Sequence, residues 1–186
     1  VPHLQKVIYG IVSRVGDQKL DVVAHSMGAR GVVQALTALA CANPPAPLIN
    51  ELVLLAPDID TDLFGQYLPL LKKAASRITI YVSENDKALA VSHEVHGYPR
   101  LGEAGPHLAV FEGVDTIDIS PAGRRRMSGH IYHIFNPTVV NDLRQLLTAS
   151  KPAAQRAGLK PAERNGGTYW RLQPLENFGD ATDEEE

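Results

Sequence analysis

The residues best suited to chemistry in this sequence are a serine, an aspartate and a histidine, in that order along the chain. Ser26 lies in the string AHSMG, a variant of G-x-S-x-G with alanine in the first place. That pattern is typical of a nucleophilic serine at a sharp turn between a strand and a helix, where small neighbours are needed. The Met27 N–H would begin that helix and help to hold an oxyanion. We predict Ser26 as the nucleophile and Met27 as an oxyanion-hole donor.

A nucleophilic serine needs a general base, and the base needs an acidic residue that orients it. For serines in this setting the chain order is Ser, then Asp or Glu, then His, and each partner follows a later strand. Asp86 closes the string SEND after a predicted strand, and His130 closes SGH ahead of the last predicted helix. The sequence therefore predicts a Ser26–His130–Asp86 triad, which needs no metal or organic cofactor.

The elements that must position these residues alternate between strands and helices. Apolar side chains at helical spacing predict a first helix over 4–15, ended by Gly16. Buried strands are predicted at 20–24, 51–56, 77–82 and 114–119, and helices after residue 28, at 60–75, at 87–96 and from Pro137. Asp60 or Thr61 and Asn136 are predicted helix caps, and Pro69 is a candidate helix break. This alternation predicts an α/β fold of three α/β/α layers around a mainly parallel sheet.

The pattern changes after residue 149. We predict a domain over 1–149 and a tail over 150–186, whose acidic end, DEEE, is expected to be solvated and mobile. Tyr169 and Trp170 are the tail residues with enough apolar area to dock on the domain.

Composition narrows the class of protein. With 186 residues, 44% apolar residues and a net charge of −3, the chain is typical of one soluble globular domain and lacks the basic footprint of a nucleic-acid binder. The single cysteine, Cys41, excludes an internal disulfide and is expected to be an inert, buried or half-buried thiol. No apolar run approaches the roughly 20 residues of a membrane-spanning segment.

The chain resembles the α/β-hydrolase superfamily and, within it, a family of uncharacterised function. The resemblance covers about residues 1–149 and is carried by VAHSMG, LLAPDID, YVSENDKAL and a late GH before the last helix. It implies Ser26 as nucleophile, Asp86 as acid and His130 as base. It supplies no substrate.

The chain also departs from that superfamily. A full α/β hydrolase has several strands before its nucleophile strand, and a loop among them supplies the second oxyanion donor. Only one predicted helix precedes Leu20, and the first residue is Val1. We therefore expect the C-terminal portion of a larger unit, with any export signal outside it, so localisation stays unassigned. An unpaired apolar edge over 20–24 would favour self-association.

Several residues compete for the same roles. Asp58 follows the second predicted strand and is the alternative acid, because some α/β hydrolases place theirs there. His133 is the alternative base, and His25 is expected to line the substrate site. Ser26 as an ordinary helix cap is the alternative to a nucleophile. The string HEVH, from His93 to His96, does not match the zinc-protease pattern H-E-x-x-H and predicts an exposed helix face.

The sequence thus predicts a serine hydrolase of a small-molecule ester or related acyl compound. The alternative is a non-catalytic α/β-hydrolase-like binding or scaffold module, which the lack of a candidate for the second oxyanion donor favours.

Overall fold

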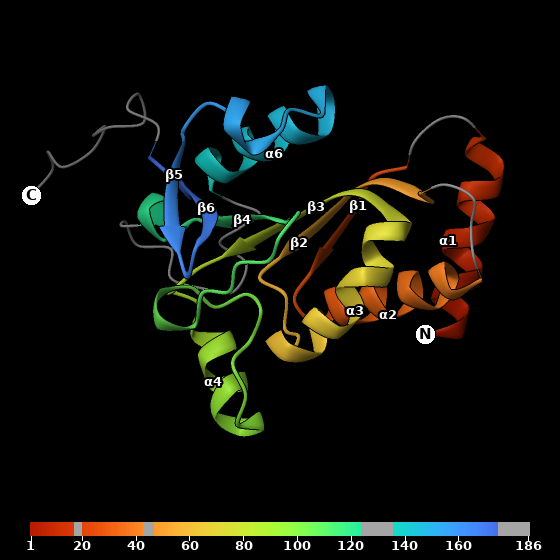
Figure 1. Ribbon diagram of the computed structural model, residues 1–186, viewed down its shortest axis with the longest axis horizontal. Coiled ribbons are helices and arrows are strands. Elements are labelled where there is room, and N and C mark those ends of the chain that lie inside the picture. The colour runs from red at the N-terminus through yellow and green to blue at the C-terminus, as the bar shows by residue number, and fades with distance from the viewer. Residues whose placement is uncertain (17–19, 43–46, 124–135, 175–186) are drawn as a thin grey trace, which may run out of the picture.

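A mixed, mostly parallel sheet forms the centre of the molecule. The computed structural model describes residues 1–16, 20–42, 47–123 and 136–174 (Figure 1). The strand order is β1-β2-β3-β4-β6-β5. The parallel strands are β1 (Val22–His25), β2 (Ile49–Leu55), β3 (Ala75–Val82), β4 (Asp115–Asp118) and β6 (Gly167–Leu172), and β5 (Leu159–Arg164) runs antiparallel to β6.

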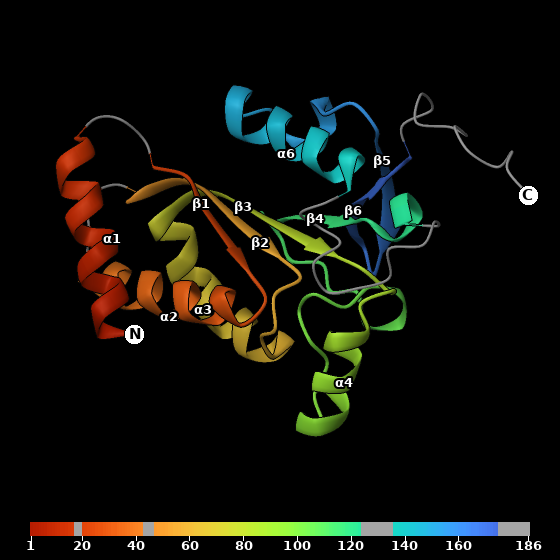
Figure 2. The ribbon, with the colours of Figure 1, turned by 180° about the vertical axis from the view of Figure 1, so that it is seen from behind.

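Helices cover both faces of this sheet. On one face lie α2 (Met27–Cys41) and α3 (Thr61–Ala74), with α1 (Pro2–Val15) packed against α2. On the other face lies α6 (Pro137–Ala149), as Figures 1 and 2 show from opposite sides. α4 (Lys87–His96) extends beyond the sheet, and short 3-10 turns η1 (Gly105–His107), η2 (Ser120–Gly123) and η3 (Ala153–Gln155) complete the described elements. The predicted three-layer α/β fold is confirmed.

The core has two parts because successive side chains of a strand point to opposite faces. Leu52 and Leu54 of β2 pack toward α2 and α3, whereas Val53 and Leu55 pack toward α6. All four side chains are at most 4% exposed. This explains why the strands read as continuous apolar runs rather than as alternating ones.

The predicted helix caps are confirmed. Asp60 Oδ1 accepts a hydrogen bond from Leu63 N at 2.8 Å, and Asn136 Oδ1 accepts one from Thr138 N at 2.8 Å. The candidate break at Pro69 is wrong, because α3 continues through it to Ala74. Buried side chains before and after Pro69 outweigh the roughly 3 kcal/mol that an interior proline costs: Phe64, Leu68, Leu71 and Ala74.

The helical stripe of α1 is buried less than expected. Ile8 is buried, but Val7 is 55% and Ile11 40% exposed. The reason is that α1 rests on α2 rather than on the sheet, so that a narrower strip is covered. Cys41, expected to be buried or half-buried, is exposed at the last residue of α2.

The chain after residue 149 differs most from expectation. Instead of a plain tail, residues 159–172 form a β5–β6 hairpin that continues the sheet beyond β4. Its two-residue turn is Asn165-Gly166, with φ 51° and 78°. Tyr169 packs on one core layer and Trp170 on the other, so the predicted docking is confirmed. The acidic end lies outside the described residues.

A buried polar cluster joins α6 to the sheet and to the segment leading into the hairpin. Tyr81 on β3 donates its hydroxyl to Asp142 Oδ2 of α6 at 2.6 Å. Arg156 donates to both groups, at 3.0 Å and 2.9 Å. The Arg156 and Asp142 side chains are 0% exposed. Burial raises the pKa of Asp142 above its ordinary value of 3.8, and Arg156 opposes that rise.

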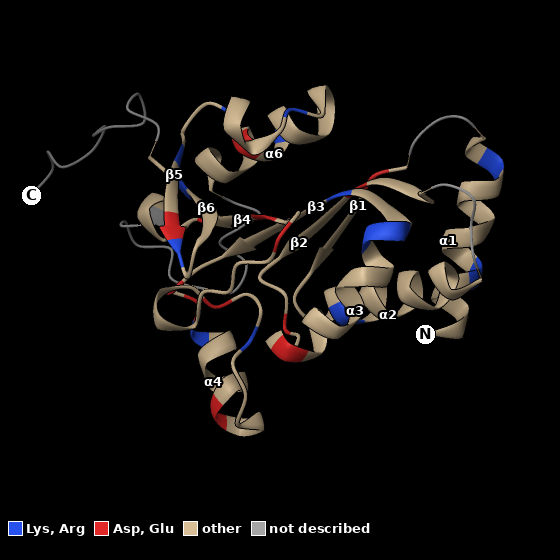
Figure 3. Cartoon of the chain, in the orientation of Figure 1, with Lys and Arg blue, Asp and Glu red and all other residues tan. Residues whose placement is uncertain are grey.

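Charged residues of both signs are interspersed over the described elements (Figure 3). Within the residues that the structure describes, no helix is both long enough and apolar enough to span a membrane.

Candidate active site

Ser26 is the single residue between β1 and α2, and its backbone is unusual. Its φ is 55° and its ψ −131°, a region that a residue with a side chain rarely adopts. Such a conformation costs on the order of 1–3 kcal/mol and persists only where the surroundings enforce it. Ser26 N donates to Leu55 O at 3.0 Å, and Ser26 O accepts from Ala29 N at 3.1 Å and Asp58 N at 3.3 Å. These bonds hold the turn against the end of β2.

The Ser26 side chain does not behave as an ordinary helix cap. No hydrogen bond from α2 to the Ser26 side chain caps the helix, in contrast to Asp60 on α3 and Asn136 on α6. Ser26 is half-buried, and Met27 is 72% exposed at the first position of α2. N–H groups in the first turn of a helix lack intrahelical acceptors. The Met27 N–H is therefore placed where the positive end of the helix dipole would favour an oxyanion.

The two small neighbours of Ser26 differ in their surroundings. Ala24 is 6% exposed, in agreement with the predicted need for a small residue there. A Cβ added at Gly28 would meet nothing within 4 Å among the described residues. Close packing at Gly28 is therefore not seen in the described part of the chain, because this residue lies on the exposed side of the first turn of α2.

Asp86 lies at the same edge of the sheet as Ser26. His25, Leu55 and Tyr81 are in register across β1, β2 and β3, and Ser26 and Asp86 follow the first and the third of these strands. Asp86 is 5% exposed, and its Oδ1 accepts from Ala88 N and Leu89 N, both at 3.1 Å, which caps α4.

The predicted base, His130, and the alternative base, His133, lie outside the described residues.

Asp58, the alternative acid, is close to Ser26 but carries an ion pair. Its Oδ1 accepts from Ser92 Oγ at 2.8 Å and lies 3.3 Å from Arg100 Nε. Arg100 is 6% exposed. A guanidinium at this distance neutralises much of the carboxylate charge that an orienting acid would offer to an imidazolium.

Residues 100–103 bind the ends of two strands together. Gly102 O accepts from Ser83 N after β3, and Gly102 N donates to Pro57 O after β2, both at 3.0 Å. A Cβ on Gly102 would lie 2.6 Å from Leu89 Cδ1 and 2.7 Å from the carbonyl carbon of Ala56. Only glycine fits this approach, so Gly102 helps to fix the edge from which Asp58 and Asp86 emerge.

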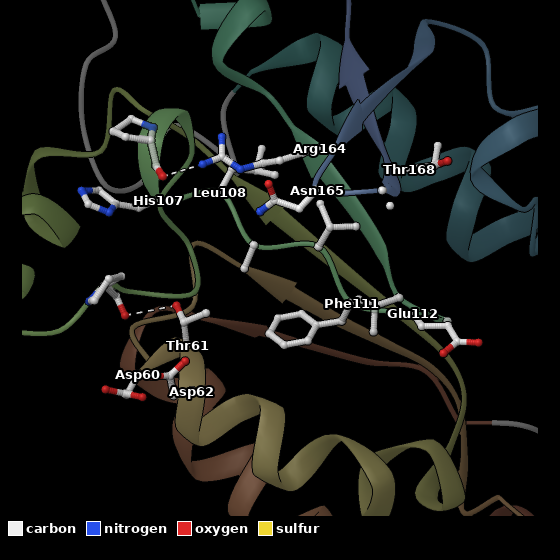
Figure 4. A pocket seen from close by; sticks show the side chains of 18 residues that line it. Asp60, Thr61, Asp62, His107, Leu108, Phe111, Glu112, Arg164, Asn165 and Thr168 are labelled. Atoms are coloured by element: carbon white, nitrogen blue, oxygen red, sulfur yellow. Dashed lines mark hydrogen bonds between the residues drawn. The ribbon is translucent and has the colours of Figure 1, made fainter.

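Two pockets lie near this edge. A pocket of about 330 Å³ adjoins the Ser26 turn and is lined by Met27, Arg30, Gly31, Gln34, Asp58, His96 and Arg100. His25, predicted to line the substrate site, is half-buried and is not among these residues. A larger pocket of about 930 Å³ lies between the start of α3, residues 106–114 and the β5–β6 turn (Figure 4). Ser26 and Asp86 line neither pocket, but Met27 lines the smaller one, so we associate the smaller pocket with the serine turn.

Compared with protein families, residues 1–150 match the one described as alpha/beta hydrolase of unknown function (DUF900). The chain belongs to this family. Curated proteins and solved structures give no match. The family description names a fold and leaves the function unknown. The mainly parallel sheet of this alpha/beta hydrolase agrees with that fold.

Sequence reasoning missed two residues that shape this edge of the alpha/beta hydrolase. Arg100 and Gly102 lie in a stretch without periodicity, and their roles depend on contacts with residues far from them in sequence. The sequence signal for Gly102 is weak, because a glycine after an arginine and a leucine is unremarkable. No charge pattern links Arg100 to Asp58 before the fold is known.

Proposed function

We propose that this alpha/beta hydrolase is a serine hydrolase that cleaves an ester or related acyl bond. The observation that carries the proposal is the conformation of Ser26, with φ 55° at a one-residue turn between β1 and α2. Strain of this kind concentrates at active sites, and a serine on a sharp strand-to-helix turn exposes its Oγ at the edge of the sheet. The small pocket supports the proposal because it is lined by Met27, the residue that follows Ser26.

In the proposed reaction, Ser26 Oγ attacks the acyl carbonyl carbon while His130 accepts the Oγ proton. The Met27 N–H helps to hold the oxyanion of the tetrahedral intermediate. The bond to the leaving alcohol breaks, and His130 returns the proton to that alcohol. Water then attacks the acyl-Ser26 ester with His130 again as base, which releases the carboxylic acid. Asp86 holds the imidazole in the required tautomer.

A fluorophosphonate probe tests this proposal, because it forms a covalent adduct with an activated serine. We expect the wild type to be labelled and Ser26→Ala to lose the label, along with about 10⁴- to 10⁶-fold in ester turnover. Ser13→Ala is the matched control, since Ser13 Oγ donates to Tyr9 O of its own helix, α1. His130→Ala should lose the label and His133→Ala should keep it.

The competing function is a non-catalytic binding or scaffold module. Among the described residues, the Met27 N–H is the one group to which we assign an oxyanion role, and the lack of a second donor there favours this alternative. A wild type that takes no label and hydrolyses no ester would support this alternative and contradict the hydrolase.

A further inference from the structure

Three potential metal ligands converge outside the proposed triad. His93 comes from α4, Glu103 from the segment that follows Gly102, and His107 from the end of η1. One ligand atom from each residue can be chosen so that all lie within 4.8 Å of one another. The His93 and His107 rings meet edge to face, with centroids 4.7 Å apart. The prediction that HEVH forms an exposed helix face is therefore wrong for His93, because the His93 side chain is half-buried and contacts Glu103.

The spacing between His93 and Glu103 suits two ligands of one small ion. His93 Nδ1 lies 3.2 Å from Glu103 Oε1 and 3.0 Å from Oε2. Two ligands of one tetrahedral zinc, with bonds of about 2.0–2.2 Å, lie about 3.4 Å apart. A metal ion could therefore replace the proton between His93 and Glu103 with little movement of either side chain.

The backbone around the ligands is already held in place. Glu103 Oε2 accepts from Arg100 N at 2.7 Å, which orients the buried carboxylate. Arg164 of β5 donates to Gly105 O at 2.7 Å and to Pro106 O at 2.5 Å, so the turn that presents His107 is fixed to the hairpin (Figure 4). Hydrogen bonds that orient ligands in this way commonly accompany metal sites and contribute to their affinity.

The donor set indicates the kind of metal. Two imidazoles and one carboxylate suit zinc and neighbouring transition metals, whereas magnesium and calcium prefer oxygen ligands throughout. Three protein ligands leave a fourth position for water. His107 is exposed and lines the larger pocket, which gives an ion a route from solvent.

We propose that His93, Glu103 and His107 form a binding site for one zinc-class divalent ion. The ion fastens the middle of α4 to η1 and, through Arg164, to the hairpin. The site is separate from the proposed serine chemistry and does not depend on it.

The test uses the untagged chain, stripped of metal with a chelator, because a histidine tag would bind the same ions. We expect one equivalent of Zn²⁺ by calorimetry, a rise in the melting temperature with Zn²⁺, and absorption bands of four-coordinate Co²⁺ when cobalt is added. His107→Ala and Glu103→Gln should each lower the affinity more than about tenfold. His96→Ala is the control, being a histidine on the same helix outside the cluster.

Two results would overturn the proposal: no stoichiometric binding by the wild type, or equal affinity in wild type and His107→Ala. Since His107 is exposed, its loss should leave the circular dichroism spectrum unchanged, and a folded variant keeps the comparison valid. Fluorophosphonate labelling of the metal-free protein separates this outcome from failure of the hydrolase proposal.

Discussion

Two carboxylates at the edge of the sheet differ in what surrounds them. Asp58 shares its Oδ1 with Ser92 and the buried Arg100, whereas the Oδ1 of Asp86 accepts two backbone N–H groups. Two backbone N–H donors to one oxygen hold the Asp86 carboxylate in a fixed position at the start of α4. We therefore propose Asp86 as the acid that orients the histidine, and Asp58 as the partner that holds residues 99–103 in place.

Asparagine substitutions at these two positions separate the roles. We expect Asp86→Asn to lower kcat on an ester by about 10⁴-fold, because an amide favours the wrong imidazole tautomer. Asp58→Asn should stay within about tenfold of wild type. Steady-state kinetics on one chromogenic ester measures both. An asparagine oxygen still caps α4, so folding should survive, and circular dichroism checks this. The reverse order of effects would make Asp58 the orienting acid.

At the scale of elements, the cluster of Tyr81, Asp142 and Arg156 ties three segments together. Asp142 Oδ1 and Arg156 Nε and Nη2 are buried without hydrogen-bond partners in the part of the chain described. A buried ion pair of this kind contributes little net stability over apolar side chains, but removing one partner strands a charge. The cluster therefore specifies how α6 and residues 153–156 dock rather than adding much to the free energy of unfolding.

We predict that Arg156→Met lowers the free energy of unfolding by about 3–5 kcal/mol at pH 7. Burial raises the pKa of Asp142, and losing Arg156 raises it further. Because the pKa of Asp142 is raised in the folded state, protonation of this carboxyl stabilises the fold at pH values below the unfolded-state pKa of 3.8. That stabilisation is lost as the pH rises through the folded-state pKa of Asp142. The deficit of Arg156→Met should therefore shrink on acidification toward pH 4, as measured by urea unfolding at both pH values.

A double variant serves as the control. Asp142→Leu/Arg156→Met removes both charges and should recover most of the loss at pH 7. A double variant as unstable as Arg156→Met would mean that packing, and not the stranded carboxylate, causes the loss.

Local signals made most elements predictable, and their absence explains the rest. Asp60 and Asn136 cap helices with short side chains that act within three residues, so a sequence is enough to find them. The β5–β6 hairpin was missed because Lys160, Glu163 and Arg164 interrupt its apolar pattern. Its Asn165-Gly166 turn is nevertheless a strong hairpin signal.

At the candidate site, the string around Ser26 was sufficient to predict a sharp turn, because the constraint is local. Glu103 and His107 could not be joined to His93 from the sequence, since α4 and η1 must first fold back on one another. The partner of Arg100 is hard to predict for the same reason: Asp58 is separated from Arg100 by three elements, α3, β3 and α4.

At the scale of the whole molecule, β1 is an edge of the sheet. It pairs with β2 alone within the described ranges, and Val23 on it is 47% exposed. An exposed apolar edge offers unpaired backbone groups to another strand. We predict that the chain self-associates through β1, with a second copy as the partner.

Sedimentation velocity over a range of protein concentrations tests this. We expect the wild type to form dimers or larger species and Val23→Lys to shift it toward monomer, because a charged side chain disfavours pairing at an edge. Val91→Lys is the matched control: Val91 is 58% exposed but lies on α4, away from that edge. A wild type that is monomeric throughout would contradict the prediction.

The residues that line the larger pocket come from two parts of the chain. Residues 60–62 and 106–114 lie inside the stretch shared with the family, and residues 164–168 of the hairpin turn lie beyond it. Ser26, Asp58 and Asp86 all belong to the shared stretch. A change confined to the hairpin turn would alter this wall of the pocket and leave the serine turn as it is. Diversification of ligand choice in this pocket could thus proceed without altering the residues proposed to break the bond.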